Sequence, residues 1–185
     1  STHFTGSNAY LSFHNSSAFA FGTGAFTIEF WFNGPLNDDK FILSGRAAVT
    51  TLHITFGGYG SSTAGSLRYV GSSTITTGSD LISDNTWHHV AIERDGSNNI
   101  VLYIDGVSKA TGTDTTNYTT TTGDWGIGHS NSSNSNYSNA YFSNFRIVKG
   151  SNVYGGAFTP PTAPLTDPSV AGEMAVDFTG DAEYI

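Results

Sequence analysis

Two extended runs joined by a tight polar turn, within residues 85–110, constrain the fold of this chain more than any other stretch. Apolar side chains recur at every second position in residues 90–93 and again in residues 100–104. This period of two is typical of a β-strand with one buried face. Residues 95–99, Asp-Gly-Ser-Asn-Asn, supply the turn, because Gly and Asn tolerate positive φ. The stretch therefore predicts a β-hairpin, and Asp105-Gly106 predicts a second turn after it.

Short extended runs separated by turn residues make up most of the remaining chain. They recur at a spacing of roughly 8–12 residues, as in sandwiches and jelly rolls. No stretch shows the period of 3.6 residues that indicates a helix. We therefore expect an all-β sandwich or jelly roll, with strands in residues 2–4, 9–13, 26–33, 40–44, 51–56, 67–70, 73–77, 87–94, 100–104, 107–110, 125–128 and 140–149.

The composition excludes several classes of function. The net charge is −8 and the sequence has no basic stripe, so we expect no nucleic-acid partner and no anionic membrane surface as a partner. No apolar run reaches the length of a membrane span, so we expect no membrane insertion. The chain has no cysteine, which excludes disulfides, thiolate metal sites and cysteine nucleophiles.

Only 12% of residues are charged, about half the usual share. The polar surface must then consist of Ser, Thr, Asn and Gly, which is common on extracellular and virion proteins. We expect an extracellular, cell-surface or virion location. The opening residues Ser1-Thr2-His3 do not resemble a signal peptide, and they fit a mature end or a fragment of a longer protein.

The composition changes after residue 150, and we expect three segments. Residues 1–158 are the predicted domain, and residues 159–174 a Pro-rich linker that begins in a stretch holding all but one of the five prolines. Residues 178–185 match residues 4–11 at four positions. Residues 175–185 are therefore either the first strand of a following repeat or a strand that docks on a neighbouring subunit. Chance similarity of two Gly-turn strands is the third interpretation.

The hairpin residues 87–96 and 102–106 resemble the laminin G-like, concanavalin A-like lectin/glucanase superfamily. Supporting matches appear in family order and span about residues 1–165, in residues 4–11, 26–32, 142–150 and 158–161. The last pair resembles versions found in marine bacteriophage structural proteins and large bacterial surface proteins. The resemblance implies two antiparallel sheets packed as a jelly-roll sandwich, one of them concave. It implies little about function, because one fold hosts many functions.

Catalytic carboxylates are not expected. Glucanases of this superfamily use closely spaced carboxylates on one strand face, about 5–5.5 Å apart for retaining chemistry. Here Glu29 is followed on its face by Trp31 and Asn33, and Asp95, two residues after Glu93, falls in the turn. The glucanase motif is therefore absent, and a glycoside hydrolase is only a remote alternative.

The neighbouring histidines His88 and His89 face opposite sides of their strand, so they cannot simply chelate one ion. We expect them to pack and hydrogen-bond beside Trp87. Any function is then expected in the polar loops at the edges of the sandwich and not in the hairpin.

Aromatic side chains in Asn-, Ser- and Gly-rich loops are candidates for stacking on sugars, with Asn, Asp and backbone groups bonding the hydroxyls. Trp31 joins them if its strand face lines the concave sheet. Each ring alone also fits a core or loop anchor. The candidates are Tyr59, Tyr118, Trp125, Tyr137 and Trp31.

Calcium is the expected ion, in a structural role. The resemblance implies it, because many relatives bind one through Asp, Asn and backbone oxygens, which suit a hard cation. The candidate ligands are Asn8, Asp114, Asp124 and Asn144, although Asn144 stands where relatives often carry Asp. Turn capping by the same side chains is the alternative.

Two functions from different classes remain open. The first is a non-catalytic carbohydrate-binding or adhesion module of a larger surface or virion protein, with a cell-surface glycan as its partner. The second is a purely structural decoration, fibre or spacer domain that contacts neighbouring protein subunits in a tandem or homo-oligomeric assembly. The polar loops favour the first function, and the apparent repeat with its Pro-rich linker favours the second equally.

Overall fold

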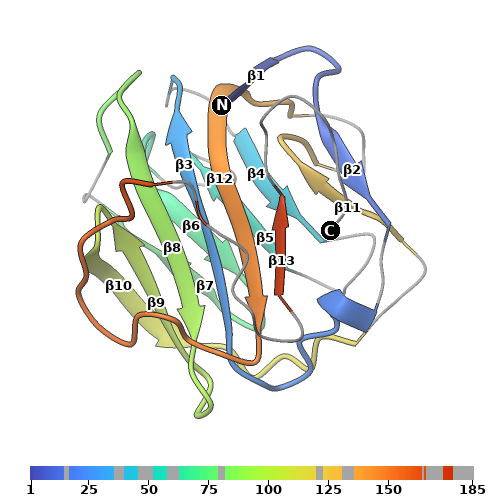
Figure 1. The fold of residues 1–185 in the computed structure, drawn as a ribbon, viewed down its shortest axis with the longest axis vertical. Helices are drawn as coiled ribbons and strands as arrows, with labels where there is room; N and C mark the ends of the chain where they lie inside the picture. Colours follow the sequence, from blue (N-terminus) through green and yellow to red (C-terminus); the bar gives the residue numbers. More distant parts are fainter. Residues whose placement is uncertain are drawn as a thin grey trace.

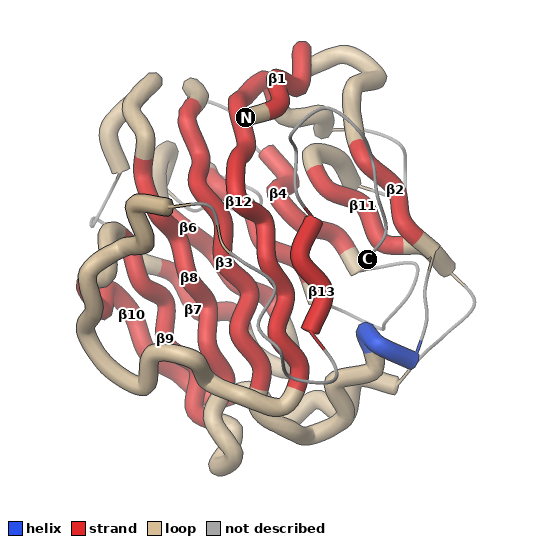
Figure 2. The backbone as a smooth tube through the Cα atoms, in the orientation of Figure 1, coloured by secondary structure: helices blue, strands red, loops and turns tan. Residues whose placement is uncertain are grey.

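In the computed structural model, the chain folds into two antiparallel β-sheets packed face to face (Figure 1). This arrangement confirms the predicted sandwich. The structure describes residues 1–14, 17–35, 40–45, 52–57, 63–78, 82–119, 123–130, 136–163, 165 and 173–176. Figure 2 shows strands and loops almost throughout, with one short 3-10 helix, η1 (Ser17–Phe19). Within these residues no helix is long and apolar enough to cross a membrane.

The seven-stranded sheet has the order β1-β12-β3-β8-β9-β10, and β13 also pairs with β12. The six-stranded sheet has the order β2-β11-β4-β5-β6-β7. The bounds are β1 Thr2–Thr5, β2 Leu11–Phe13, β3 Phe26–Asn33, β4 Lys40–Ser44, β5 His53–Phe56, β6 Leu67–Val70, β7 Thr74–Thr76, β8 His88–Arg94, β9 Asn99–Ile104, β10 Val107–Thr113, β11 Trp125–Ile127, β12 Asn139–Lys149 and β13 Glu173–Val176.

The predicted hairpin is formed by β8 and β9, with Ile92 opposite Leu102 in the register. Its turn is held by Asp95, whose Oδ1 accepts the backbone N–H groups of Ser97 and Asn99 at 2.8 and 2.9 Å. The second turn is also present, and Asp105 and Gly106 both have positive φ there. The local prediction from turn residues and alternation is therefore confirmed.

The core lies between the sheets and is rich in phenylalanine. On β3, the inward positions Phe26, Ile28, Phe30 and Phe32 are at most 1% exposed. Phe32 meets Phe56 of the other sheet with ring centroids 4.6 Å apart. Burial of these large side chains stabilises the fold, and the few charged residues of the chain could not supply a comparable contribution.

The outer face of the seven-stranded sheet is partly covered by residues 150–163, here called the strap (Figure 1, orange to red). The Val153 N–H donates to Thr27 Oγ1 at 3.0 Å, and the Tyr154 N–H donates to Glu93 Oε1 at 2.6 Å. Farther along, the Phe158 N–H donates to the Gly106 carbonyl at 3.0 Å. The strap leaves one part of the sheet face buried and the other part open.

Two short strands pair with the edge of β12 that faces away from β3. β1 pairs with residues 139–142 and β13 pairs with residues 145–148, both antiparallel. Residues 177–185, which include the predicted repeat match, lie outside the described residues. The repeat, the linker and docking on a neighbour therefore stay predictions.

Candidate functional site

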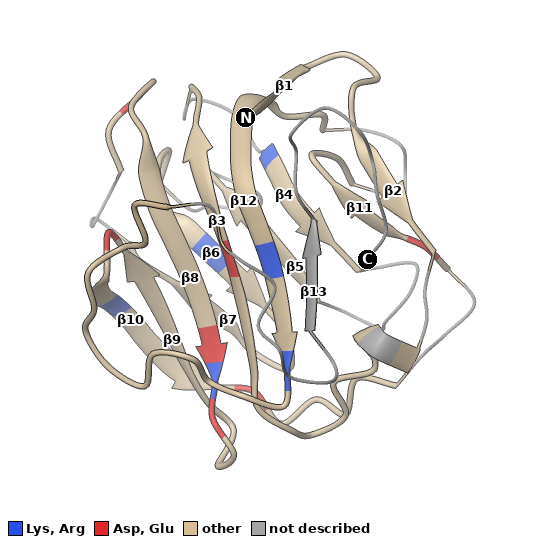
Figure 3. Cartoon of the chain, in the orientation of Figure 1, with Lys and Arg blue, Asp and Glu red and all other residues tan. Residues whose placement is uncertain are grey.

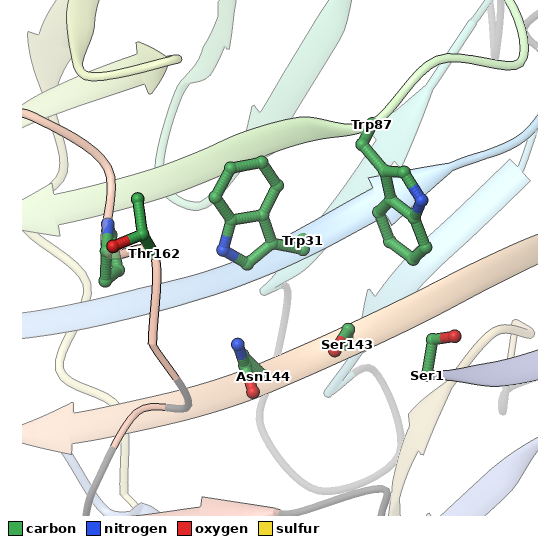
Figure 4. Close-up of a pocket in the computed structure, with 7 residues that line it drawn as sticks. Ser1, Trp31, Trp87, Ser143, Asn144 and Thr162 are labelled. Carbon is green, nitrogen blue, oxygen red and sulfur yellow. The ribbon is translucent and has the colours of Figure 1, made fainter.

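A groove of about 420 Å³ lies on the open part of the outer sheet face. Trp31 of β3, Trp87 just before β8, and Ser143 and Asn144 of β12 line it, and the strap contributes Pro161 and Thr162 beside Ser1. Figure 4 shows the two indoles side by side, with the β12 residues below them and Thr162 at the far end. The volume lies within the range of about 300–1,000 Å³ that is usual for small-ligand sites.

Strand pairing brings the two tryptophans to one face. Trp31 lies opposite His89 in the β3–β8 register, and Trp87 is two residues before His89, on the same side of the strand. Trp87 is 40% exposed, which is unusual for so large an apolar side chain. The sheet therefore presents two indoles to one hollow.

A β-bulge places Asn144 in the groove. The β12–β3 register shifts between Ser143 and Arg146, and Asn144 has a φ of 50°. Asn is among the few residue types that adopt this left-handed conformation readily. Such bulges re-aim a side chain and are frequent beside binding sites. The groove thus combines two aromatic faces with an amide and hydroxyl groups.

A hydrogen-bonded chain holds the loop that carries Trp87. His88 Nδ1 lies 2.7 Å from Asp105 Oδ2, and His88 Nε2 lies 2.8 Å from Ser83 Oγ. Asp105 Oδ1 also accepts the His89 backbone N–H at 2.9 Å. The residue order resembles a hydroxyl–imidazole–carboxylate triad. However, Nε2 also accepts the Ser83 backbone N–H at 3.1 Å, so the imidazole serves as a clamp on the loop.

The two histidines have separate partners, as their opposite facing predicts. His88 joins the clamp, whereas the buried His89 directs its Nε2 to Glu29 at 3.1 Å. The interpretation as packing and hydrogen-bonding residues beside Trp87 therefore describes both side chains.

Under the strap, Glu29 is the centre of a buried polar network. Arg146 Nε donates to it at 2.7 Å, and the Tyr154 hydroxyl donates at 2.6 Å. Figure 3 shows the acidic position on β3 beside the basic position on β12. Burial alone would raise the pKa of Glu29, but hydrogen bonds from His89 and Tyr154 and the charge of Arg146 hold it below its ordinary value. Glu29 is therefore ionised, and both of its oxygens accept hydrogen bonds.

Glu93, the second carboxylate on this face, binds the strap backbone. Its oxygens accept the N–H groups of Tyr154 and Gly155 at 2.6 and 3.0 Å and the Thr27 hydroxyl at 3.2 Å. Both oxygens of each carboxylate therefore accept hydrogen bonds from protein groups. This arrangement favours a structural role over general acid–base chemistry.

The glycan candidates chosen from the sequence fall into different environments. Trp31 lines the groove. Tyr118 and Trp125 have no exposed area, so neither ring offers a face to a sugar, and the alternative interpretation as anchors describes them. Tyr137 is partly exposed and stacks on His129 at 5.8 Å. Tyr59 lies outside the described residues.

The sequence alone does not single out Trp87, because it belongs to the stretch that predicts the hairpin, while function is expected in the edge loops. Pairing residues 26–33 with residues 87–94 would have placed Trp31 and Trp87 on one face. No comparable pattern in the sequence predicts the bulge at Asn144 or the course of the strap.

The calcium candidates are spread over separate surroundings. Asp114 is buried, and its Oδ1 accepts the N–H groups of Ser72 and Thr116, both at 3.0 Å, while its Oδ2 accepts the hydroxyls of Tyr69 and Tyr118. Burial would raise the pKa of Asp114, but the hydrogen bond from Tyr69 and the others lower it well below its ordinary value. This carboxylate is a cap, as the alternative interpretation describes.

The other three candidates do not join Asp114. Asp124 pairs with His14 Nδ1 at 2.9 Å, Asn8 is an exposed turn residue with a φ of 56°, and Asn144 lies in the groove. In the part of the chain that the structure describes, no three acidic or histidine side chains form a cluster for an ion. Calcium binding stays a prediction.

Comparison with known proteins agrees with the geometry. The family model described as the concanavalin A-like lectin/glucanases superfamily matches residues 5–151. A search of curated proteins found no match.

Solved structures share the fold at low identity. The binding domain of Paraclostridial Mosquitocidal Protein 1 is 16% identical, with a TM-score of 0.57, over 82% of this chain and 39% of that chain. A Bacteroides ovatus protein described as a candidate carbohydrate-binding protein is 17% identical, with a TM-score of 0.65, over 96% of this chain and 55% of that chain. The mouse laminin alpha1 chain, domains LG4-5, is 17% identical, with a TM-score of 0.54, over 78% and 40%. The chain thus spans about half or less of these structures.

Proposed function

Because the chain belongs to the concanavalin A-like lectin/glucanases superfamily, we propose that it is a non-catalytic carbohydrate-binding module of a larger surface or virion protein. Its partner is a cell-surface glycan, bound in the groove between Trp31 and Trp87. The name of the Bacteroides ovatus relative, a candidate carbohydrate-binding protein, points in the same direction.

The observation that carries this proposal is the pairing of two partly exposed indoles with amide and hydroxyl groups in one hollow. An indole offers a flat apolar surface to the C–H face of a sugar ring. The Asn144 amide and the hydroxyls of Ser143 and Thr162 can bond sugar hydroxyls. A mostly apolar lining with a few placed polar groups is the usual composition of a ligand site.

The position of the carboxylates supports a binding role over hydrolysis. Hydrolysis of a glycosidic bond requires two carboxyl groups that flank the bond. Glu29 and Glu93 lie under the strap and bind Arg146, Tyr154 and Gly155. The described side chains that line the groove include no carboxylate.

A glycan array tests the proposal. We expect the protein to bind a subset of glycans, and Trp31→Ala and Trp87→Ala each to weaken that binding at least about tenfold, or 1.4 kcal/mol. Val107→Ala is the control, because Val107 is 52% exposed but lies outside the groove. Binding to no glycan, or equal loss in the Val107 variant with folding intact, would overturn the proposal.

A structural calcium ion is part of the proposal. The array is therefore run with calcium and with a chelator, and the melting temperature is measured in both. A ligand that binds only the folded state raises the melting temperature by mass action. An unchanged melting temperature would remove calcium from the proposal.

A structural spacer is the second candidate function, and the edge of β12 favours it. Residues 173–176 pair with β12 beside β1, so this edge accepts an added strand. If neighbouring subunits exchange this strand, the protein will form assemblies that light scattering detects and that removal of residues 173–185 abolishes. A monomer in both forms would exclude strand exchange between subunits.

A further inference from the structure

The strap closes one end of the groove between Trp31 and Trp87. From this geometry we infer that the groove takes the end of a neutral glycan chain and not its middle. This inference rests on the proposed carbohydrate-binding function and specifies which part of the glycan is bound.

The closed end is formed by Pro161 and Thr162. Figure 4 shows Thr162 on one side of Trp31, with Trp87 and Ser1 on the other, while the strap crosses the strands beside Trp31. Behind this wall, the rings of Tyr154 and Phe158 stack with centroids 3.5 Å apart. A chain that lies along the strands therefore meets protein at this end.

The wall is held at several points. Glu93 accepts two backbone N–H groups of the strap, and the Gly106 carbonyl accepts the N–H of Phe158. Gly106 is required there, because its φ is +77° and a Cβ atom would lie 1.8 Å from the Phe158 carbonyl oxygen. The ring of Pro161 further restricts the backbone of the wall itself. Such a wall does not yield easily to a ligand.

A second hollow of about 150 Å³ lies on the same sheet face, in the direction away from the wall. Asn33, the β3 residue two positions after Trp31, lines it together with Asn85, Asn139 and Tyr141. Tyr141 is 43% exposed and stacks on His3 with centroids 4.2 Å apart. Side-chain amides and an exposed aromatic ring continue the chemistry of the groove. The next sugars of the chain would follow this direction.

The lining favours a sugar without charge. None of the described side chains that line the groove is acidic or basic. Glu29 and Arg146 of the same sheet face are paired with each other under the strap. An anionic sugar would lose its hydration in the groove without gaining a basic side chain as a counter-charge, which is costly.

The stoichiometry of binding tests the inference without any variant. Neutral homo-oligosaccharides (gluco-, manno- and xylo-hexaoses) and the matching long polysaccharides are titrated at equal mass by calorimetry. Binding to a chain end predicts one site per chain, so the number of sites per gram is inversely proportional to chain length. Sites that scale with mass instead of chain number would overturn the inference while the carbohydrate-binding function stands.

A wall variant gives the second readout. The double substitution Pro161→Ala and Thr162→Ala lowers the wall but leaves Trp31 and Trp87 in place. We expect it to bind additional sites within the long polysaccharides and to keep its affinity for the hexaoses. An unchanged preference for chain ends in the folded variant would contradict the role of the wall. A preference for a sulfated polysaccharide over its neutral form would contradict the neutral lining, and binding of no carbohydrate would refute the proposed function itself.

Discussion

The outer face of the seven-stranded sheet has a covered half and an open half, and β3, β8 and β12 contribute to both. The two halves differ in which side chains are buried and which are exposed. In the covered half, Glu29 and Glu93 are buried and bonded to the strap. In the open half, Trp31 and Trp87 lie at the surface. Charges usually lie outside and large aromatic rings inside. The strap hydrogen-bonds to the buried carboxylates, whereas the two indoles keep part of their surface exposed in the groove, and exposed apolar surface of this kind marks interaction sites.

The largest effect on stability is expected from Glu29→Ala. Removal of this carboxylate leaves Arg146, His89 and Tyr154 without their shared acceptor, and loss of one member of a buried pair costs about 3–5 kcal/mol. Urea unfolding measures the change. A loss below about 1 kcal/mol would mean that the strap does not depend on the network.

A smaller loss is expected for Tyr154→Phe. The change deletes one hydrogen bond to an ionised carboxylate and keeps the ring stack on Phe158, so the free energy of unfolding should fall by about 1.5 kcal/mol. Phe158→Leu, which keeps the hydrogen bond and removes the stack, is the companion variant. If the two variants lose stability independently, their double mutant will show additive losses.

Acid should weaken the covered half. The folded pKa of Glu29 is lower than its ordinary value of 4.5, so its contribution is complete above pH 4.5 and is lost as the pH falls through the folded pKa. Asp114, with a lowered pKa, adds to the same trend at lower pH. The melting temperature should therefore fall below about pH 4.5. In Glu29→Gln this dependence should be shallower, and an equally steep curve would assign the acid sensitivity to other groups.

The smallest effect on stability is expected in the open half. Trp87→Ala should change the free energy of unfolding by about 0.5 kcal/mol or less, as is usual for surface positions, while glycan binding is lost. The variant thus separates the two halves, because Glu29→Ala should affect mainly folding. A large loss of stability in Trp87→Ala would show that the indole is a structural anchor, and its exposure would no longer indicate a ligand.

The sequence predicts local structure better than tertiary contacts. The alternation in residues 26–33 places Glu29, Trp31 and Asn33 on one face, and the turn residues predict the β8–β9 hairpin, as the structure confirms. Burial of Tyr118 and Trp125 depends on packing between distant strands, which a polar loop composition does not reveal. The same limit applies to the groove. Its wall comes from residues about 130 positions after Trp31, in a Pro-rich stretch that reads locally as a linker.

The neutral lining of the groove has a consequence for the medium in which the protein works. At physiological ionic strength, salt largely screens interactions between exposed charges that are more than about 8–10 Å apart. It leaves stacking and neutral hydrogen bonds largely intact. Electrostatic steering is then not expected to accelerate binding of the proposed glycan. Binding through Trp31, Trp87 and Asn144 should therefore vary little between dilute buffer and concentrated salt.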